Sequence, residues 1–235
     1  MRGKLITDFH QGFLTFLALL GVSLGLVLLQ PDLGTASIIA LIAVGMYFLA
    51  GAPLRYVGAI VLAGGVALVG LVAIAPYRFQ RILTFINPEL DPQGAGYQIT
   101  QAFIAIGSGG WFGRGFGLSR AKFQYLPEPA GDSIYAIAAE ELGFFIALGI
   151  VVLFAYLLYR GFAVARTVRD PFGQLLIGGI VIWITGQAFL NIGAMVGVLP
   201  LTGIPLPFIS YGGTSLAALL TAVGVMLNVS REAKV

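Results

Sequence analysis

Six apolar stretches without a single charged residue constrain the fold of this sequence more than any other feature. They cover residues 13–29, 34–50, 57–75, 142–159, 172–195 and 214–229. An α-helix needs roughly 20 such residues to cross the hydrocarbon core of a bilayer, and 58% of the chain is hydrophobic against 10% charged. We therefore predict an all-α, polytopic integral membrane protein with about six transmembrane helices, forming a single membrane domain over residues 1–235.

The sequence has no cysteine and one histidine, His10. These counts exclude disulfides, thiolate chemistry, a Ser-His-Asp triad and a metal site built on several histidines, so we predict no metal-ligating residues. The net charge is +3, but the basic residues are scattered, as is typical of membrane topology signals. We accordingly expect no nucleic-acid partner.

The distribution of basic residues predicts the orientation in the membrane. The side that carries the N-terminus holds eight of them, Arg2, Lys4, Arg55, Arg160, Arg166, Arg169, Arg231 and Lys234. The other side holds five, all within the long segment 76–131, and its two short connections contain none. Because cytoplasmic loops are enriched in Lys and Arg, we expect both termini to be cytoplasmic and residues 76–131 to lie outside the bacterial cytoplasmic membrane.

The long segment 76–131 is expected to be mostly irregular. Residues 97–108 are amphipathic, with apolar isoleucines and Phe103 set against polar glutamines and Thr100, and they are too few to span a bilayer, which predicts an interfacial or re-entrant helix. The run GSGGWFGRGFG, Gly107–Gly117, lacks the spacing of a nucleotide cradle. It favours tight turns, with Trp111 and Phe112 at the level of the lipid headgroups.

Five basic residues surround these turns, and two interpretations of them stay open. They are either solvated loop cations near anionic headgroups, or one or two of them clamp a pyrophosphate through charge-assisted hydrogen bonds. The residues are Arg78, Arg81, Arg114, Arg120 and Lys122.

The most charged passage in an apolar context is LPEPAGDSIYAIAAEELG, Leu126–Gly143. Glu128 lies in a turn bounded by prolines, and Asp132 or Ser133 is predicted to cap the fourth membrane helix. At a helix start, free N–H groups and the helix dipole favour the ionised carboxylate. Asp132 would then be an anion just outside the lipid, where a base acting on a membrane-bound substrate belongs.

Glu140 and Glu141 stand near the outer boundary of the same helix. Carboxylates at such depth suggest function, and a structural pair with a loop arginine is an equal alternative. On the same stretch of helix, the stripe of Ala136, Ala139 and Gly143 suits close packing or a groove for a lipid chain.

The last loop, 198–211, is irregular, uncharged and apolar, so it is expected to be covered by protein or to line a cavity. Gln187 and Asn191 share a helix face leading toward this loop. For them we expect interhelical hydrogen bonds in preference to substrate contact.

Several motifs together resemble the SEDS family of bacterial envelope proteins, which includes FtsW, RodA and their sporulation relatives. They are QPDLGTA, GYQ, AIGSGGWFGRGFG, YLPE with the later Asp and AEELG, and PLPFISYGG, in the family's order over nearly the whole chain. The resemblance is stronger to the division type, FtsW, than to RodA. It implies about ten membrane helices, of which this sequence matches the last six; a gene fragment, a split gene and a reduced protein are alternative explanations. In the Asp132 turn, Ala130, Gly131 and Ser133 replace the His, Thr and Phe common in the family.

The resemblance implies a peptidoglycan glycosyltransferase that polymerises lipid II at the outer face of the membrane during cell division. It implies Asp132 as the catalytic base, with Glu140 and Glu141 supporting it. As substrate-binding residues we name Glu128, Arg78, Arg81, Arg114, Lys122, Gln30 and Ser210, with Asp32 as a further candidate. No covalently bound cofactor is implied, and a divalent cation is an alternative source of positive charge. The implied partners are lipid II, a class B penicillin-binding protein and divisome membrane proteins.

Two other functions remain as alternatives. A flippase for lipid-linked precursors would carry polar residues through several helices to the cytoplasmic side, whereas here polar groups concentrate on the outer side. A non-catalytic, truncated scaffold that binds a class B penicillin-binding protein is the second alternative, because part of a cavity need not hold lipid II.

Overall fold

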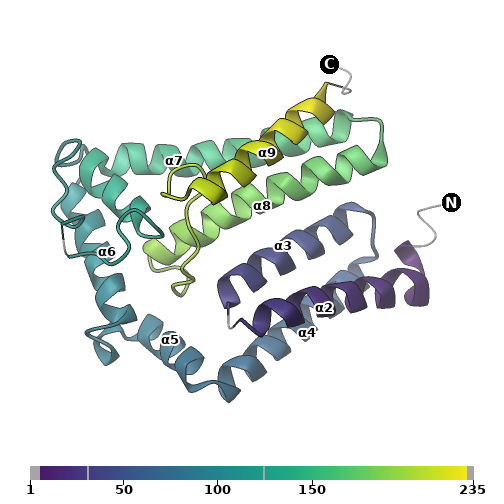
Figure 1. Ribbon diagram of the computed structural model, residues 1–235, viewed down its shortest axis with the longest axis horizontal. Helices are drawn as coiled ribbons and strands as arrows, with labels where there is room; N and C mark the ends of the chain where they lie inside the picture. The colour runs from purple at the N-terminus through teal and green to yellow at the C-terminus, as the bar shows by residue number, and fades with distance from the viewer. Residues whose placement is uncertain (1–5, 31, 124, 232–235) are drawn as a thin grey trace. The chain divides into compact units, whose positions relative to one another are not determined.

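The computed structural model describes residues 6–30, 32–123 and 125–231. No β-strand occurs within these ranges, which confirms the predicted all-α fold (Figure 1). The elements are η1 (Phe9–Leu14), α2 (Thr15–Leu28), α3 (Leu33–Leu49), α4 (Leu54–Ile74), α5 (Pro76–Ile86), η2 (Pro88–Leu90), α6 (Ala95–Gly109), α7 (Ile134–Thr167), α8 (Pro171–Met195) and α9 (Gly213–Ser230).

Five segments of the described chain are long and apolar enough to cross a membrane: Phe9–Leu28, Leu54–Ile74, Ile134–Thr167, Pro171–Met195 and Gly213–Ser230. The apolar helix α3 is shorter, with 17 residues, and together these correspond to the six predicted helices. Many of their large apolar side chains are exposed, such as Leu62 and Val69 on α4, at 71% and 70%. An apolar exterior of this kind is stable in lipid and costly in water, so the chain is an integral membrane protein.

Residue contacts divide the chain into two compact units. The first comprises the described residues of Met1–Ile74, Leu158–Gly186 and Ala222–Val235, and the second comprises those of Ala75–Leu157 and Gln187–Thr221. The second unit contains the passage that the sequence singles out as a candidate site.

Within the first unit, α2, α3 and α4 lie side by side (Figure 1). Their core contains Leu20, Tyr47 and Ile60, and the ring of Phe16 stacks on Tyr47 with 4.2 Å between ring centroids. A Cβ added to Gly45 on α3 would lie 2.6 Å from a side-chain carbon of Ile182 on α8. The two helices therefore approach closely at Gly45, as is common where small residues lie between membrane helices, and only the flexible end of the Ile182 side chain would have to move for a larger residue.

The segment after α4 is more regular than predicted. We expected residues 76–131 to be irregular apart from 97–108, but Pro76–Ile86 forms the additional helix α5, and Pro88–Leu90 forms a 3-10 turn. Pro76 ends α4 and occupies the first turn of α5, where its missing N–H is not needed. The helix predicted over residues 97–108 is confirmed as α6, Ala95–Gly109, and its interfacial or re-entrant position stays a prediction.

Helix α7 is interrupted at Gly143, whose φ of 80° and ψ of 179° are not helical. Nothing in the neighbouring sequence predicted this break. It separates a short first segment from the long apolar remainder of the helix, and it lies directly after Glu140 and Glu141.

Candidate active site

Asp132 lies in the turn between Leu126 and α7. Glu128 has a φ of 46°, which non-glycine residues rarely adopt, and its carbonyl oxygen accepts hydrogen bonds from the N–H groups of Gly131 (3.0 Å) and Ser133 (3.4 Å). The two prolines that flank Glu128 exclude a helix there. The chain is thus folded into a tight turn immediately before the helix.

The helix start agrees with the prediction, but its capping does not. α7 begins at Ile134, and the carbonyl oxygen of Ser133 accepts from the N–H of Ala136. The hydroxyl of Ser133 instead donates to the carbonyl oxygen of Pro127 at 2.9 Å, and no hydrogen bond joins either the Asp132 or the Ser133 side chain to the first N–H groups of α7. The predicted N-cap role of these side chains is therefore wrong.

The carboxylate of Asp132 is held instead by Gln98 of α6. The amide Nε2 of Gln98 lies 3.3 Å from both Oδ1 and Oδ2 of Asp132, and 3.1 Å from Oγ of Ser133. These residues are 34 and 35 positions apart in the chain. The GYQ motif, which sequence reasoning assigned to no role, thus supplies a direct partner of the candidate base.

The electrostatic environment of Asp132 differs from the expectation. Burial is the largest influence and raises the pKa of the carboxyl group. The nearby charge of Glu128 raises this pKa further, while hydrogen bonds from Gln98, from its own backbone N–H and from Ser133 oppose the shift without cancelling it. We expected the helix start to favour the ionised form; the structure contradicts this because desolvation outweighs the hydrogen bonds.

The backbone carbonyl groups of the Asp132 turn accept hydrogen bonds from two other segments, α8 and the last loop. Nδ2 of Asn191, on α8, donates to the carbonyl oxygen of Asp132 at 2.7 Å. Oγ of Ser210 donates to the carbonyl oxygen of Gly131 at 2.6 Å, and the N–H of Tyr211 donates to that of Ala130 at 2.8 Å. Segments distant in sequence therefore fix the position of the Asp132 turn.

Asn191 and Gln187 hold irregular backbone. Asn191 also donates to the carbonyl oxygen of Ile204 at 2.7 Å, and Gln187 donates to that of Pro205 at 2.8 Å. We predicted hydrogen bonds between helices, whereas these bonds reach the last loop and the Asp132 turn. The same contacts satisfy the backbone carbonyl groups of Ile204 and Pro205 in the apolar loop 198–211.

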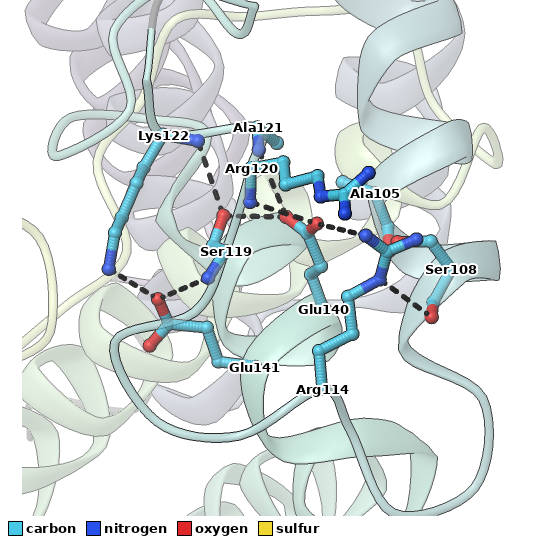
Figure 2. Close-up of polar contacts among 9 residues, drawn as sticks. All are labelled: Ala105, Ser108, Arg114, Ser119, Arg120, Ala121, Lys122, Glu140 and Glu141. Atoms are coloured by element: carbon cyan, nitrogen blue, oxygen red, sulfur yellow. Dashed lines mark hydrogen bonds and ion pairs between the residues drawn. The ribbon is translucent and has the colours of Figure 1, made fainter.

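Glu140 and Glu141 point toward the loop that precedes the turn and hold it (Figure 2). Glu140 is 2% exposed and accepts from the Ser119 hydroxyl (2.5 Å) and from the N–H groups of Arg120 (3.1 Å) and Ala121 (3.2 Å). Glu141 accepts from the N–H groups of Gly117 (2.9 Å) and Ser119 (3.2 Å). Each buried carboxylate is thus surrounded by donors, as burial of a charge requires.

Both glutamates also pair with basic residues of the same loop. Nζ of Lys122 lies 2.7 Å from Oε1 of Glu141, and a guanidinium nitrogen of Arg114 lies 3.8 Å from Oε1 of Glu140. The structural interpretation, a pair with a loop arginine, is confirmed for Glu140 with Arg114, whereas the cation that pairs with Glu141 is a lysine, Lys122. Arg114 and Lys122 are engaged in this way, while their predicted binding of substrate stays a prediction.

The glycine-rich loop is inserted into the break of α7. The N–H groups of Phe144 and Phe145 donate to the carbonyl oxygens of Gly110 (2.9 Å) and Trp111 (3.5 Å). The carbonyl oxygens of Glu140 and Glu141 accept in turn from the N–H groups of Arg114 (2.9 Å) and Gly115 (3.0 Å), so the loop bonds to the helix on both sides of the break. The loop thus takes the place of two backbone hydrogen bonds that an unbroken helix would make across Gly143. The predicted tight turns are confirmed.

The remaining predicted residues lie as follows. On α5, Arg78 is buried and its Nε donates to the Tyr77 hydroxyl at 2.8 Å, whereas Arg81 is exposed. Gln30 and Asp32 belong to the first compact unit, where Oδ1 of Asp32 caps α3 by accepting from the N–H of Thr35 at 2.9 Å. Their predicted contacts with substrate stay predictions.

An apolar pocket of about 320 Å³ lies beside the small-residue stripe. Its lining includes Tyr135 and Ala139 from α7, Trp111 from the glycine-rich loop and Val196 after α8. Ala136 and Ala139 are themselves buried, and Gly109 packs directly on the backbone of Ala139. The stripe therefore serves close packing on one side and borders an apolar space.

Comparison with known proteins places this geometry in a family. The family model "cell cycle protein" of the FtsW, RodA and SpoVE proteins matches residues 2–235. The chain is 46% identical over 233 residues to stage V sporulation protein E of Bacillus subtilis, covering 99% of this chain and 64% of that protein. It is 45% identical over 220 residues to a probable peptidoglycan glycosyltransferase FtsW of Thiomicrospira cyclica, covering 91% and 56%.

A solved structure has a similar fold. One chain from a peptidoglycan synthase complex, described as coordinating polymerisation and crosslinking, superimposes with a TM-score of 0.76 at 28% identity, covering 95% of this chain and 62% of that one. The chain thus spans about three-fifths of the length of the proteins that it matches. With the family model matched from residue 2 to residue 235, the chain belongs to the FtsW/RodA/SpoVE family of membrane proteins.

Proposed function

We propose that this chain carries the catalytic aspartate of a peptidoglycan glycosyltransferase that polymerises lipid II at the outer face of the bacterial cytoplasmic membrane in cell division. The observation that carries the proposal is the setting of Asp132, a partly buried carboxylate at the start of a membrane helix, held by Gln98 and by a pinned backbone turn. Relatives named as probable peptidoglycan glycosyltransferases support the reaction class.

In the proposed reaction, the Asp132 carboxylate takes the proton from the 4-hydroxyl of the acceptor N-acetylglucosamine. The hydroxyl oxygen forms a bond to the anomeric carbon of the donor N-acetylmuramic acid, whose bond to the pyrophosphate oxygen breaks with inversion. Undecaprenyl pyrophosphate leaves as the anion. Burial makes Asp132 a stronger base than an ordinary aspartate, and general bases of this kind contribute about 10²- to 10⁴-fold to rates.

The departing pyrophosphate needs positive charge. Arg114 and Lys122 would have to leave their glutamates to supply it, so we favour the exposed Arg81 and Arg120. No group of three metal-ligating side chains comes together in the described ranges. We therefore propose that any divalent cation arrives bound to the pyrophosphate, as Mg²⁺ commonly does with phosphate substrates.

The proposed partner is a class B penicillin-binding protein, by analogy with the solved synthase complex, together with other membrane proteins of the divisome. The test is polymerisation of labelled lipid II by the chain in its native membrane assembly with that partner, resolved as glycan strands on gels. We expect strands longer than one disaccharide unit. Movement of lipid II across vesicles without any polymer would contradict the proposal and support a flippase, and binding of the partner without either activity would support a scaffold.

The proposed orientation is testable because the chain has no cysteine. Gln93 is exposed in the segment between η2 and α6. In a Gln93→Cys variant, we expect a membrane-impermeant maleimide to label the thiol from outside intact cells. Labelling only after the cytoplasmic side is opened would reverse the proposed topology.

A further inference from the structure

The side chain of Gln98 donates hydrogen bonds to both oxygens of the Asp132 carboxylate. Its Nε2 lies within 3.3 Å of both carboxylate oxygens. The hydroxyl of Ser133 is also near, 3.4 Å from Oδ1, but it has one proton, and the Pro127 carbonyl oxygen at 2.9 Å is the closer acceptor. The Gln98 amide is therefore the main side-chain donor to the carboxylate.

We propose that Gln98 is a positioning residue, which keeps the Asp132 carboxylate oriented toward the acceptor hydroxyl in both of its protonation states. An amide offers an N–H donor and a carbonyl acceptor on one group. While Asp132 is ionised, Nε2 donates to it; after Asp132 has taken the proton, a rotated amide accepts from its O–H. This inference rests on the proposed function of Asp132.

The groups around Asp132 make this role specific to Gln98. Glu128 is the charged residue that acts on Asp132, and it raises the pKa. The other contacts, Ser133 and Asn191, are neutral, and Asn191 binds only the backbone carbonyl of Asp132. Gln98 is thus the side chain whose replacement changes both the orientation and the proton affinity of the base.

The first test is Gln98→Glu, which places a second carboxylate against Asp132. Two carboxylates in contact share one proton and titrate as a pair. We expect the acid limb of the polymerisation rate to move up by about one pH unit or more, with activity recovering as the pH rises. Gln93→Glu adds the same charge at an exposed position before α6 and should leave the limb in place. A uniform loss at every pH, or an unmoved limb, would overturn the proposal.

The second test does not depend on polymerisation. Infrared spectra of the membrane-embedded protein, minus those of Asp132→Asn, report protonation of this carboxyl group against pH. In Gln98→Met both of the hydrogen bonds proposed for Gln98 are lost, and the charge-assisted bond to the ionised carboxylate is the stronger of the two, so the titration should shift to higher pH, whereas Gln93→Met should not shift it. An unchanged titration in Gln98→Met would refute the positioning role even if the wild type polymerises lipid II. If the wild type makes no polymer but the titration shifts in Gln98→Met, only the proposed function is refuted.

Discussion

Replacing Asp132 by asparagine is expected to lower the rate of glycan polymerisation by about 10²- to 10⁴-fold, the usual contribution of a general base. Asparagine keeps the shape of the side chain and an oxygen that accepts from Gln98, so the turn should persist. What disappears is the lone pair that takes the proton. The rate would be measured with labelled lipid II and normalised to the amount of protein in the membrane.

Stability distinguishes loss of chemistry from loss of fold. Because burial raises the pKa of Asp132, protonation of this group favours the folded state, and that contribution is lost as the pH rises through the raised pKa. At neutral pH the asparagine variant should therefore unfold in detergent at a temperature no lower than the wild type. Asp91→Asn is the matched control and should keep the wild-type rate, since Oδ2 of Asp91 accepts from the N–H of Ala95, the first residue of α6, at 2.9 Å and Asp91 has no role in the proposed reaction. A wild-type rate in Asp132→Asn would show that Asp132 is not the base, and Glu128 would then be the next candidate.

The second large effect is expected at Gly113. Its φ of 80° disfavours any side chain, and an added Cβ would collide with the backbone at Glu141 and Gly143. Backbone cannot move aside as a flexible side chain can, so Gly113→Ala should expel the loop from the break in α7. We expect a loss of about 3 kcal/mol or more in the free energy of unfolding, or about 6–12 °C in the unfolding midpoint.

Gly117→Ala provides a matched control for this effect. Gly117 has a similar φ of 83°, but nothing lies within 4 Å of an added Cβ, and its N–H can still donate to Glu141. It should therefore show only the backbone penalty, about 1–2 kcal/mol. Equal losses in both variants would mean that the close approach of loop and helix does not matter for stability.

Hydrophobic periodicity and length predicted the membrane helices because an uncharged apolar run has few other stable environments. The amphipathic pattern of residues 97–108 predicted α6. The turn before α7 was predicted from Pro127, Pro129 and Gly131, which leave the backbone few allowed conformations. Pro76 was read only as the end of α4. A proline both ends one helix and begins the next, and only the amphipathic pattern of 76–86 could have indicated α5.

The break in α7 was beyond local reasoning. Gly143 follows good helix formers, and nothing in its neighbours shows that the loop of Gly110–Gly115 replaces the missing helix hydrogen bonds. The partners of Asp132 were hidden for the same reason, because Gln98 and Asn191 are 34 and 59 residues away in the chain. The raised pKa of Asp132 follows from burial in the folded structure, whereas its sequence neighbours suggested the opposite shift.

The dependence of the polymerisation rate on pH tests the central claim, that Asp132 is the base, most directly. A base must be ionised to act, so the rate should fall as the pH falls through the pKa of Asp132. Because that pKa is raised, the acid limb should lie above the ordinary aspartate value of about 3.9, and it should be absent from the residual activity of Asp132→Asn. An acid limb that stays unchanged in Asp132→Asn would contradict the account, because another group would then be taking the proton.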